Sequence, residues 1–88
     1  MLRILSDEEV RAHDQKAFKS LRRGSLFSYS VKPGDTRYCV VFESKDIFNR
    51  IHAVELNEKN IENMLRGVAP EVHWIALQSL RCINVLIP

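Results

Sequence analysis

At 88 residues the chain has the length of one domain with a thin core, because a domain of this size buries only about two-thirds of the surface that its unfolded form exposes. Apolar residues make up 45% of the sequence and charged residues 27%, a composition that excludes disordered and fibrous classes. The net charge of +2 is too small to indicate an anionic partner by itself. We expect a single small globular domain over residues 1–88.

Neither a targeting segment nor a membrane span is expected. Acidic residues at 7–9 interrupt the first apolar residues before a signal peptide could form. The most apolar stretch, residues 72–87, contains several polar residues and falls short of the about 20 apolar residues that a membrane span needs. Cys39 and Cys82 are expected to be buried free thiols. We therefore expect a cytoplasmic protein with no membrane partner.

The best-marked element is a helix over about residues 7–23. Ser6 and Glu9 form a capping box at its start, and Gly24 follows as a stop. Asp14 falls within the apolar stripe of this helix, and no sequence pattern explains it. The stripe consists of Val10, Ala17, Phe18 and Leu21.

Strand signals follow the helix. Residues 25–32 alternate between apolar and polar side chains, Pro33-Gly34 marks a turn, and alternation resumes up to Glu43, which predicts a β-hairpin over 25–43. The segment 44–56 has conflicting patterns, because its apolar spacing also fits a helix. We favour a connection followed by a third strand over residues 50–56.

The last third of the chain predicts one or two helices and a strand. Asn57 can cap a short helix over 58–66, and Pro70 can open another that continues to about Leu80. The apolar, β-branched run at 82–87 predicts a buried strand that closes the sheet. The fold class is therefore α+β, with an N-terminal helix, an antiparallel hairpin or meander, the later helices and a C-terminal strand. If Leu2–Leu5 formed a first strand, the order would instead fit a ferredoxin-like βαββαβ fold.

No pattern indicates catalysis, a metal or a cofactor. His13, His52 and His73 lack the close spacing by which one element presents two ligands to a metal, and the few glycines form no phosphate-binding loop. His13 and Asp14 are adjacent, but neighbours on a helix point about 100° apart, which makes them a poor acid–base pair. We expect a protein that is not an enzyme, with no catalytic residues, no metal and no cofactor.

Positive charge is concentrated in residues 11–37, where seven basic residues minus two acidic ones give +5 and leave −3 for the rest. On the first helix the basic residues point away from the apolar stripe, and such a basic face could bind the phosphates of a nucleic acid or an acidic protein surface. The alternative is an ordinary solvated face whose last residues suit the helix dipole. The candidate partner- or nucleic-acid-binding residues are Arg11, Lys16, Lys19, Arg22, Arg23, Lys32 and Arg37.

Two further features have structural and functional interpretations. Tyr38 and Phe42 alternate on a strand beside Arg37, and a basic residue beside alternating aromatic rings resembles the pattern of sheets that stack RNA bases. We expect both rings, and Trp74, to pack in the core instead, because a domain this small needs its aromatic residues inside. In the C-terminal strand, Ile83, Val85 and Ile87 would form a dimer edge if the strand lay at the border of the sheet; the alternative is a central strand paired on both sides.

The leading hypothesis is a small non-enzymatic binding or regulatory module, a regulator or inhibitor that acts by stoichiometric contact with a protein partner or as a homodimer. The first alternative is a nucleic-acid-binding protein that uses the basic face of the first helix. The second is a small basic endoribonuclease, a hypothesis that rests on size and basicity alone.

Overall fold

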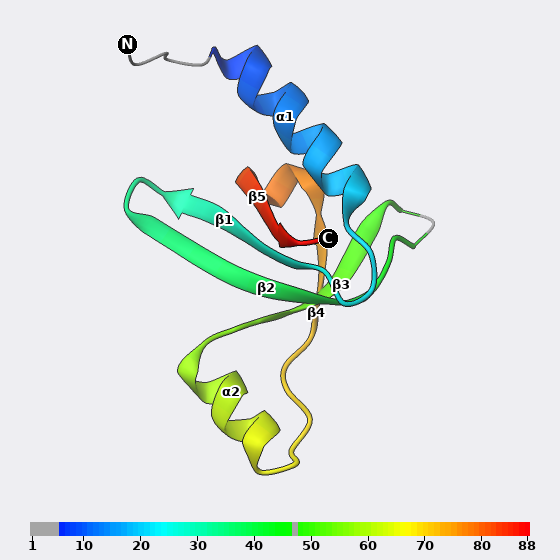
Figure 1. Ribbon diagram of the computed structural model, residues 1–88, viewed down its shortest axis with the longest axis vertical. Helices are drawn as coiled ribbons and strands as arrows, with labels where there is room; N and C mark the ends of the chain where they lie inside the picture. Colours follow the sequence, from blue (N-terminus) through cyan, green and yellow to red (C-terminus); the bar gives the residue numbers. More distant parts are fainter. Residues whose placement is uncertain (1–5, 47) are drawn as a thin grey trace.

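The computed structural model describes residues 6–46 and 48–88, and in these ranges two α-helices accompany one five-stranded sheet (Figure 1). The helices are α1 (Asp7–Ser20) and α2 (Glu58–Leu65), and a single 3-10 turn, η1, covers Leu77–Ser79. The predicted α+β class is confirmed. The sheet has the order β4-β3-β2-β1-β5, formed by β1 (Leu26–Lys32), β2 (Asp35–Glu43), β3 (Arg50–Glu55), β4 (His73–Ala76) and β5 (Arg81–Ile87).

The ferredoxin-like alternative is wrong, because the first four strands lie side by side in chain order and not in the interleaved order of two βαβ units. In a split βαβ unit a helix joins two parallel strands that lie on either side of a third, whereas here α2 joins β3 and β4, which are antiparallel neighbours. Here β1 to β4 form a meander, and β5 returns to pair with β1 at the opposite border of the sheet. The strand considered for Leu2–Leu5 lies outside the described residues.

The start of α1 is as predicted, whereas its end comes earlier. The Glu9 amide donates to the Ser6 hydroxyl over 3.2 Å, which is the expected N-terminal cap. The helix stops at Ser20 because the Ser25 hydroxyl accepts from the Arg22 amide over 2.9 Å and closes a separate turn. Arg22 and Arg23 therefore lie in that turn, beyond the helix, and the prediction that they complete its last turn is wrong.

The hairpin and the third strand match the prediction. Lys32 pairs with Asp35 across the Pro33-Gly34 turn, where Gly34 has a φ of +83° that a side chain would disfavour. The third strand runs beside β2, with Val40 opposite Val54. Sheet pairing thus resolves the conflicting pattern of 44–56 in favour of a strand.

The helix predicted from Pro70 to Leu80 is wrong. The chain forms β4 and then the single turn η1, because Trp74 pairs with His52 and Ile75 with Ile51 along β3. Ile75 packs against the core while Trp74 points to the other face of the sheet, so two-residue alternation, and not helical spacing, places these side chains. The shorter helix α2 is confirmed, with the Asn57 side chain accepting from the Asn60 amide.

The core lies between α1 and one face of the sheet. Phe18 of α1 and Leu21, directly after the helix, are 1% exposed, and they pack with side chains that alternate inward along the strands. Figure 1 shows α1 on one side of the sheet and α2 on the other side, toward opposite ends of the molecule. The strand residues of this core are Phe27, Cys39, Val41, Ile51, Ala53 and Ile83.

Asp14 is explained by β5. This buried carboxylate, 5% exposed, accepts from the amide of Cys82 over 3.0 Å and from the amide of Ile83 over 2.9 Å. The two consecutive amides converge because Cys82 adopts a φ of +52° where β5 shifts its register against β1. The Asp14 carboxylate therefore attaches α1 to β5. The Cys82 side chain is exposed, so the expectation that both thiols are buried is wrong.

Candidate functional site

The basic residues do not form one patch. Lys32 lies next to the hairpin turn, at the opposite end of β1 and β2 from the turn that carries Arg22 and Arg23 (Figure 1). Arg37 is bound to carboxylates, 3.7 Å from Asp35 and 3.5 Å from Glu55. Lys32 and Arg37 are thus separated from the other five candidates.

The five remaining basic residues are all exposed on α1 and the turn after it. Within residues 6–46 and 48–88, no carboxylate lies within ion-pair distance of any of them. A surface of unpaired cations attracts anionic groups, and its effect depends on salt. The five are Arg11, Lys16, Lys19, Arg22 and Arg23.

Lys45 adds a cation at the C-terminal end of α1. Its ammonium group donates to the backbone carbonyls of Lys19 and Leu21, over 3.2 and 3.1 Å, and lies 5.4 Å from the centre of the Phe18 ring. Burial, and then the positive charge of Arg22, lower the pKa of Lys45. Lys45 therefore joins the β2–β3 connection to the helix end and concentrates charge there.

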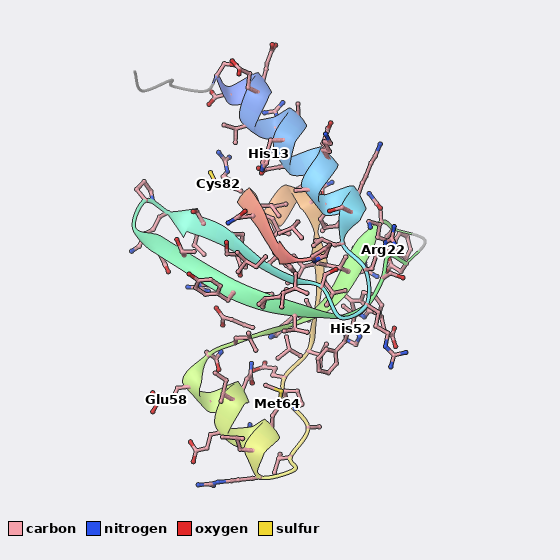
Figure 2. The ribbon with its side chains drawn as sticks, viewed as in Figure 1. His13, Arg22, His52, Glu58, Met64 and Cys82 are labelled. Atoms are coloured by element: carbon pink, nitrogen blue, oxygen red, sulfur yellow. The ribbon has the colours of Figure 1, made fainter. Side chains whose placement is uncertain are left out.

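The same connection leads to a group of stacked side chains. The His52 and Trp74 rings are parallel within 10°, with 4.3 Å between their centres. The Arg50 guanidinium lies 5.5 Å from the Trp74 ring and 5.0 Å from the Phe48 ring, and Asp46 holds it through two hydrogen bonds of 2.9 and 2.7 Å. Figure 2 shows Arg22 and His52 on the same side of the molecule.

Burial opposes the ionisation of Asp46, but hydrogen bonds outweigh it. The Arg50 side chain and the amides of Arg50 and Phe48 all donate to the carboxylate, so its pKa is lowered overall. Arg50 therefore stays fixed beside the Trp74 ring at neutral pH, through an ionised Asp46.

Three aromatic rings expected in the core are partly exposed. Tyr38 is 46% exposed, Phe42 38% and Trp74 43%, so the prediction that these rings pack inside is wrong. The reason is that α1 covers only the opposite face of the sheet, where Cys39 and Val41 point. Phe42 lines a shallow hollow of about 270 Å³ beside Arg23.

Helix α2 also presents apolar side chains to solvent. In the described part of the chain it makes few contacts with the other helices and strands. The Asn60 side chain links it to its neighbours, donating to the Glu55 carbonyl over 2.9 Å and accepting from the backbone amide of Glu71 over 3.4 Å. Asn60 is the buried residue of this helix. Exposed apolar residues of the helix and the loop after it are Ile61 at 43%, Met64 at 38%, Leu65 at 83% and Val68 at 53%.

A cleft of about 280 Å³ lies on the α1 side of the sheet, lined by polar and apolar residues of β1 to β4 and of the segment after β4. Its cation, Arg37, is already bound by carboxylates. Desolvation, followed by the charge of Glu55, raises the pKa of the Cys39 thiol at its floor to about 11, so the nucleophilic thiolate is suppressed at neutral pH. The cleft does not supply an activated nucleophile through Cys39.

The histidines lie apart and have different partners. His13 bonds the Ile83 carbonyl over 3.0 Å, His52 stacks on Trp74, and His73 lies 3.5 Å from Glu71. Among the described residues, no three His, Cys, Asp or Glu side chains are grouped as a metal ion requires. The described helices are also too short or too polar to cross a membrane.

Within residues 6–46 and 48–88, the C-terminal strand β5 lies at the border of the sheet and pairs with β1 only. It is therefore not the central strand that the buried-strand interpretation required. Ile83 is buried in the core, Val85 packs partly against it, and Ile87 is 55% exposed. His13 and Asp14 already bond backbone groups of residues 82 and 83, so α1 covers part of this edge.

The fold and its surfaces define a class: a small α+β domain with one helix packed on a five-stranded sheet and a second helix left largely unpacked. Searches against protein-family models, curated proteins and solved structures find no match to this chain.

Proposed function

We propose that this domain is a non-enzymatic binding module that acts by stoichiometric contact with a protein partner, which it holds through α2. The observation that carries the proposal is the exposure of Ile61, Met64 and Leu65 on α2 and of Val68 in the loop after it, where the helix makes few contacts with the other described helices and strands. Exposed apolar groups that gather on one element are typical of protein interaction sites.

Energetics favour a docked state of α2. An isolated helix of eight residues is marginal in water, and burial of a side chain such as Leu65 contributes about 1.5–3 kcal/mol. Asn57 and Asn60 fix the start and direction of the helix, so little order is lost on binding. A partner that covers the apolar side chains supplies the packing that the domain itself does not.

The charges around α2 define the partner further. Residues 55–71 contain four acidic residues, Glu55, Glu58, Glu62 and Glu71, against Lys59 and Arg66, which leaves −2. The complementary surface is an apolar groove or helix face with a basic rim.

Affinity capture from lysate, with and without nuclease treatment, tests this function. The wild-type domain should retain a protein in equimolar amount after nuclease treatment, and calorimetry with that purified protein should give one site per chain. Leu65→Ser should abolish binding without loss of folding, because Leu65 is 83% exposed and not part of the core. Val31→Ser, at another exposed apolar residue, is the matched control and should bind normally.

Other outcomes of this experiment have defined meanings. A concentration-dependent dimer that Leu65→Ser dissociates would identify the partner as a second copy of the chain. Equal binding by the Leu65→Ser and wild-type proteins, or turnover of a substrate by the purified domain, would contradict the proposal.

A further inference from the structure

A second surface lies where β2 leads into β3, and it uses none of the α2 residues. We propose that this surface binds a single-stranded nucleic acid, with one base stacked on Trp74 and adjacent phosphates held by Lys19, Arg22 and Lys45. The surface combines cations with exposed aromatic rings, the pair of features by which proteins hold single strands.

The cations and the rings are connected by short contacts. Lys45 reaches the carbonyls of Lys19 and Leu21, within 3.2 Å, and therefore lies at the end of α1 next to Arg22. Asp46, the next residue, binds Arg50 over 2.7 Å, and Arg50 lies 5.5 Å from the Trp74 ring. A chain of short contacts thus links the helix end to the aromatic stack.

The Trp74 ring can accept a further planar group. Its stacking neighbour His52 and its cationic neighbour Arg50 both come from β3, which lies on one side of β4. On the other side β4 has no neighbouring strand in the described part of the chain, and the Trp74 residue is 43% exposed. A base that stacks on this side extends the parallel His52–Trp74 pair by one ring.

Charge complementarity identifies the ligand as an anion. Five basic residues at this end, Lys19, Arg22, Arg23, Lys45 and Arg50, stand against the two acidic residues Glu43 and Asp46, which leaves +3. Arg50 is bound by Asp46, and Glu43 lies 4.0 Å from His52. The cations without a carboxylate among the described residues are those beside the helix end, where we place the phosphates.

The rings distinguish a single strand from other anions. An acidic protein surface would pair with the cations, but its carboxylate side chains offer no ring to extend the parallel His52–Trp74 stack, whereas a base does. A duplex keeps its bases stacked inside and cannot offer one to a side chain. Phosphates and accessible bases occur together in single-stranded RNA or DNA.

Trp74 is the one tryptophan in the sequence, so intrinsic fluorescence reports directly on this site. Addition of a 12-nucleotide oligo(U) or oligo(dT) strand should quench it at low salt. With three phosphates contacted, the logarithm of affinity should fall against the logarithm of salt concentration with a slope of about −2, at about 0.7 per phosphate. In anisotropy measurements with a labelled strand, Trp74→Ala should weaken binding about 5- to 150-fold, the equivalent of one stacked base.

Matched variants separate binding from folding. Trp74→Phe keeps an aromatic ring and should retain most of the affinity that Trp74→Ala loses, while circular dichroism checks the sheet. Arg22→Glu should weaken binding and flatten the salt slope, whereas Lys59→Glu, the same charge change on α2, should alter neither. Fluorescence unchanged by the strand, binding that a duplex or polyglutamate matches, or equal effects of Arg22→Glu and Lys59→Glu would each overturn the inference.

Discussion

Replacement of Asp14 gives the sharpest test of how the helix is attached to the sheet. The carboxylate is 5% exposed and accepts hydrogen bonds from two consecutive β5 amides. A hydrogen bond to a charged group contributes about 1.5–3 kcal/mol, and an orphaned buried donor costs about 1–3 kcal/mol. We therefore expect Asp14→Ala to lower the free energy of unfolding by about 3–5 kcal/mol, a large part of the about 4–13 kcal/mol available to a chain of this length.

Urea denaturation followed by circular dichroism measures this loss. Asp14→Asn keeps one acceptor oxygen and should lose about half as much, near 2 kcal/mol. Asp7→Asn removes the same charge from the exposed first turn of the same helix and should cost less than about 1 kcal/mol. If Asp14→Ala destabilised the protein no more than Asp7→Asn, the attachment of α1 through this carboxylate would be refuted.

Three other predictions follow from single residues. Burial raises the pKa of the Cys39 thiol from 9.0 to about 11 in the folded protein. Between these pH values the unfolded chain loses this proton while the folded protein keeps it, so the free energy of unfolding is full below about pH 9 and falls as the pH rises to about 11. Cys39→Ala should flatten that decline in urea titrations. At pH 8 a thiol reagent should modify exposed Cys82 rapidly and Cys39 only on unfolding, and modification of both at one rate would contradict the fold. Asn60→Ala should accelerate amide exchange across α2 and leave the sheet protected, whereas Lys59→Ala should leave both unchanged.

A fifth prediction concerns the positive φ at Cys82. Glycine adopts this conformation freely, whereas a β-branched residue is strained there. Cys82→Gly should therefore be at least about 1 kcal/mol more stable than Cys82→Val in denaturant titrations. Equal stability of the two variants would show that the backbone at β5 does not require the left-handed conformation.

The sequence predicted correctly those helices and turns whose ends are marked by capping or turn residues within the segment itself. Three such signals act over only three or four residues: the Ser6–Glu9 cap, the Pro33-Gly34 turn and the Asn57 cap. The structure contains both caps and the turn at the predicted positions. The segment from Pro70 to Leu80 failed because its conformation depends on pairing with β3, about 20 residues earlier in the chain. Such pairing has no signature in the segment itself.

The exposed surfaces were harder to predict than the helices and strands, because exposure depends on which elements pack together in the tertiary structure. Exposure of Trp74 and Phe42 follows from the coverage of only one sheet face by α1, which alternation alone does not reveal. A signal for α2 was present, because Ile61, Met64 and Leu65 lie on a helix too short to pack well by itself. Asp14 in an apolar stripe was likewise a sign of a buried polar contact, although its partners, the amides of β5, could not be identified from sequence.

The central claim is that α2 is the element that a protein partner covers. Hydrogen-exchange mass spectrometry of the domain, free and in complex with its purified partner, tests it most directly. We predict that binding slows exchange across residues 58–68 and leaves the amides of α1 unchanged. Protection confined to α1 or to the sheet, with α2 exchanging as fast as in the free domain, would contradict the account.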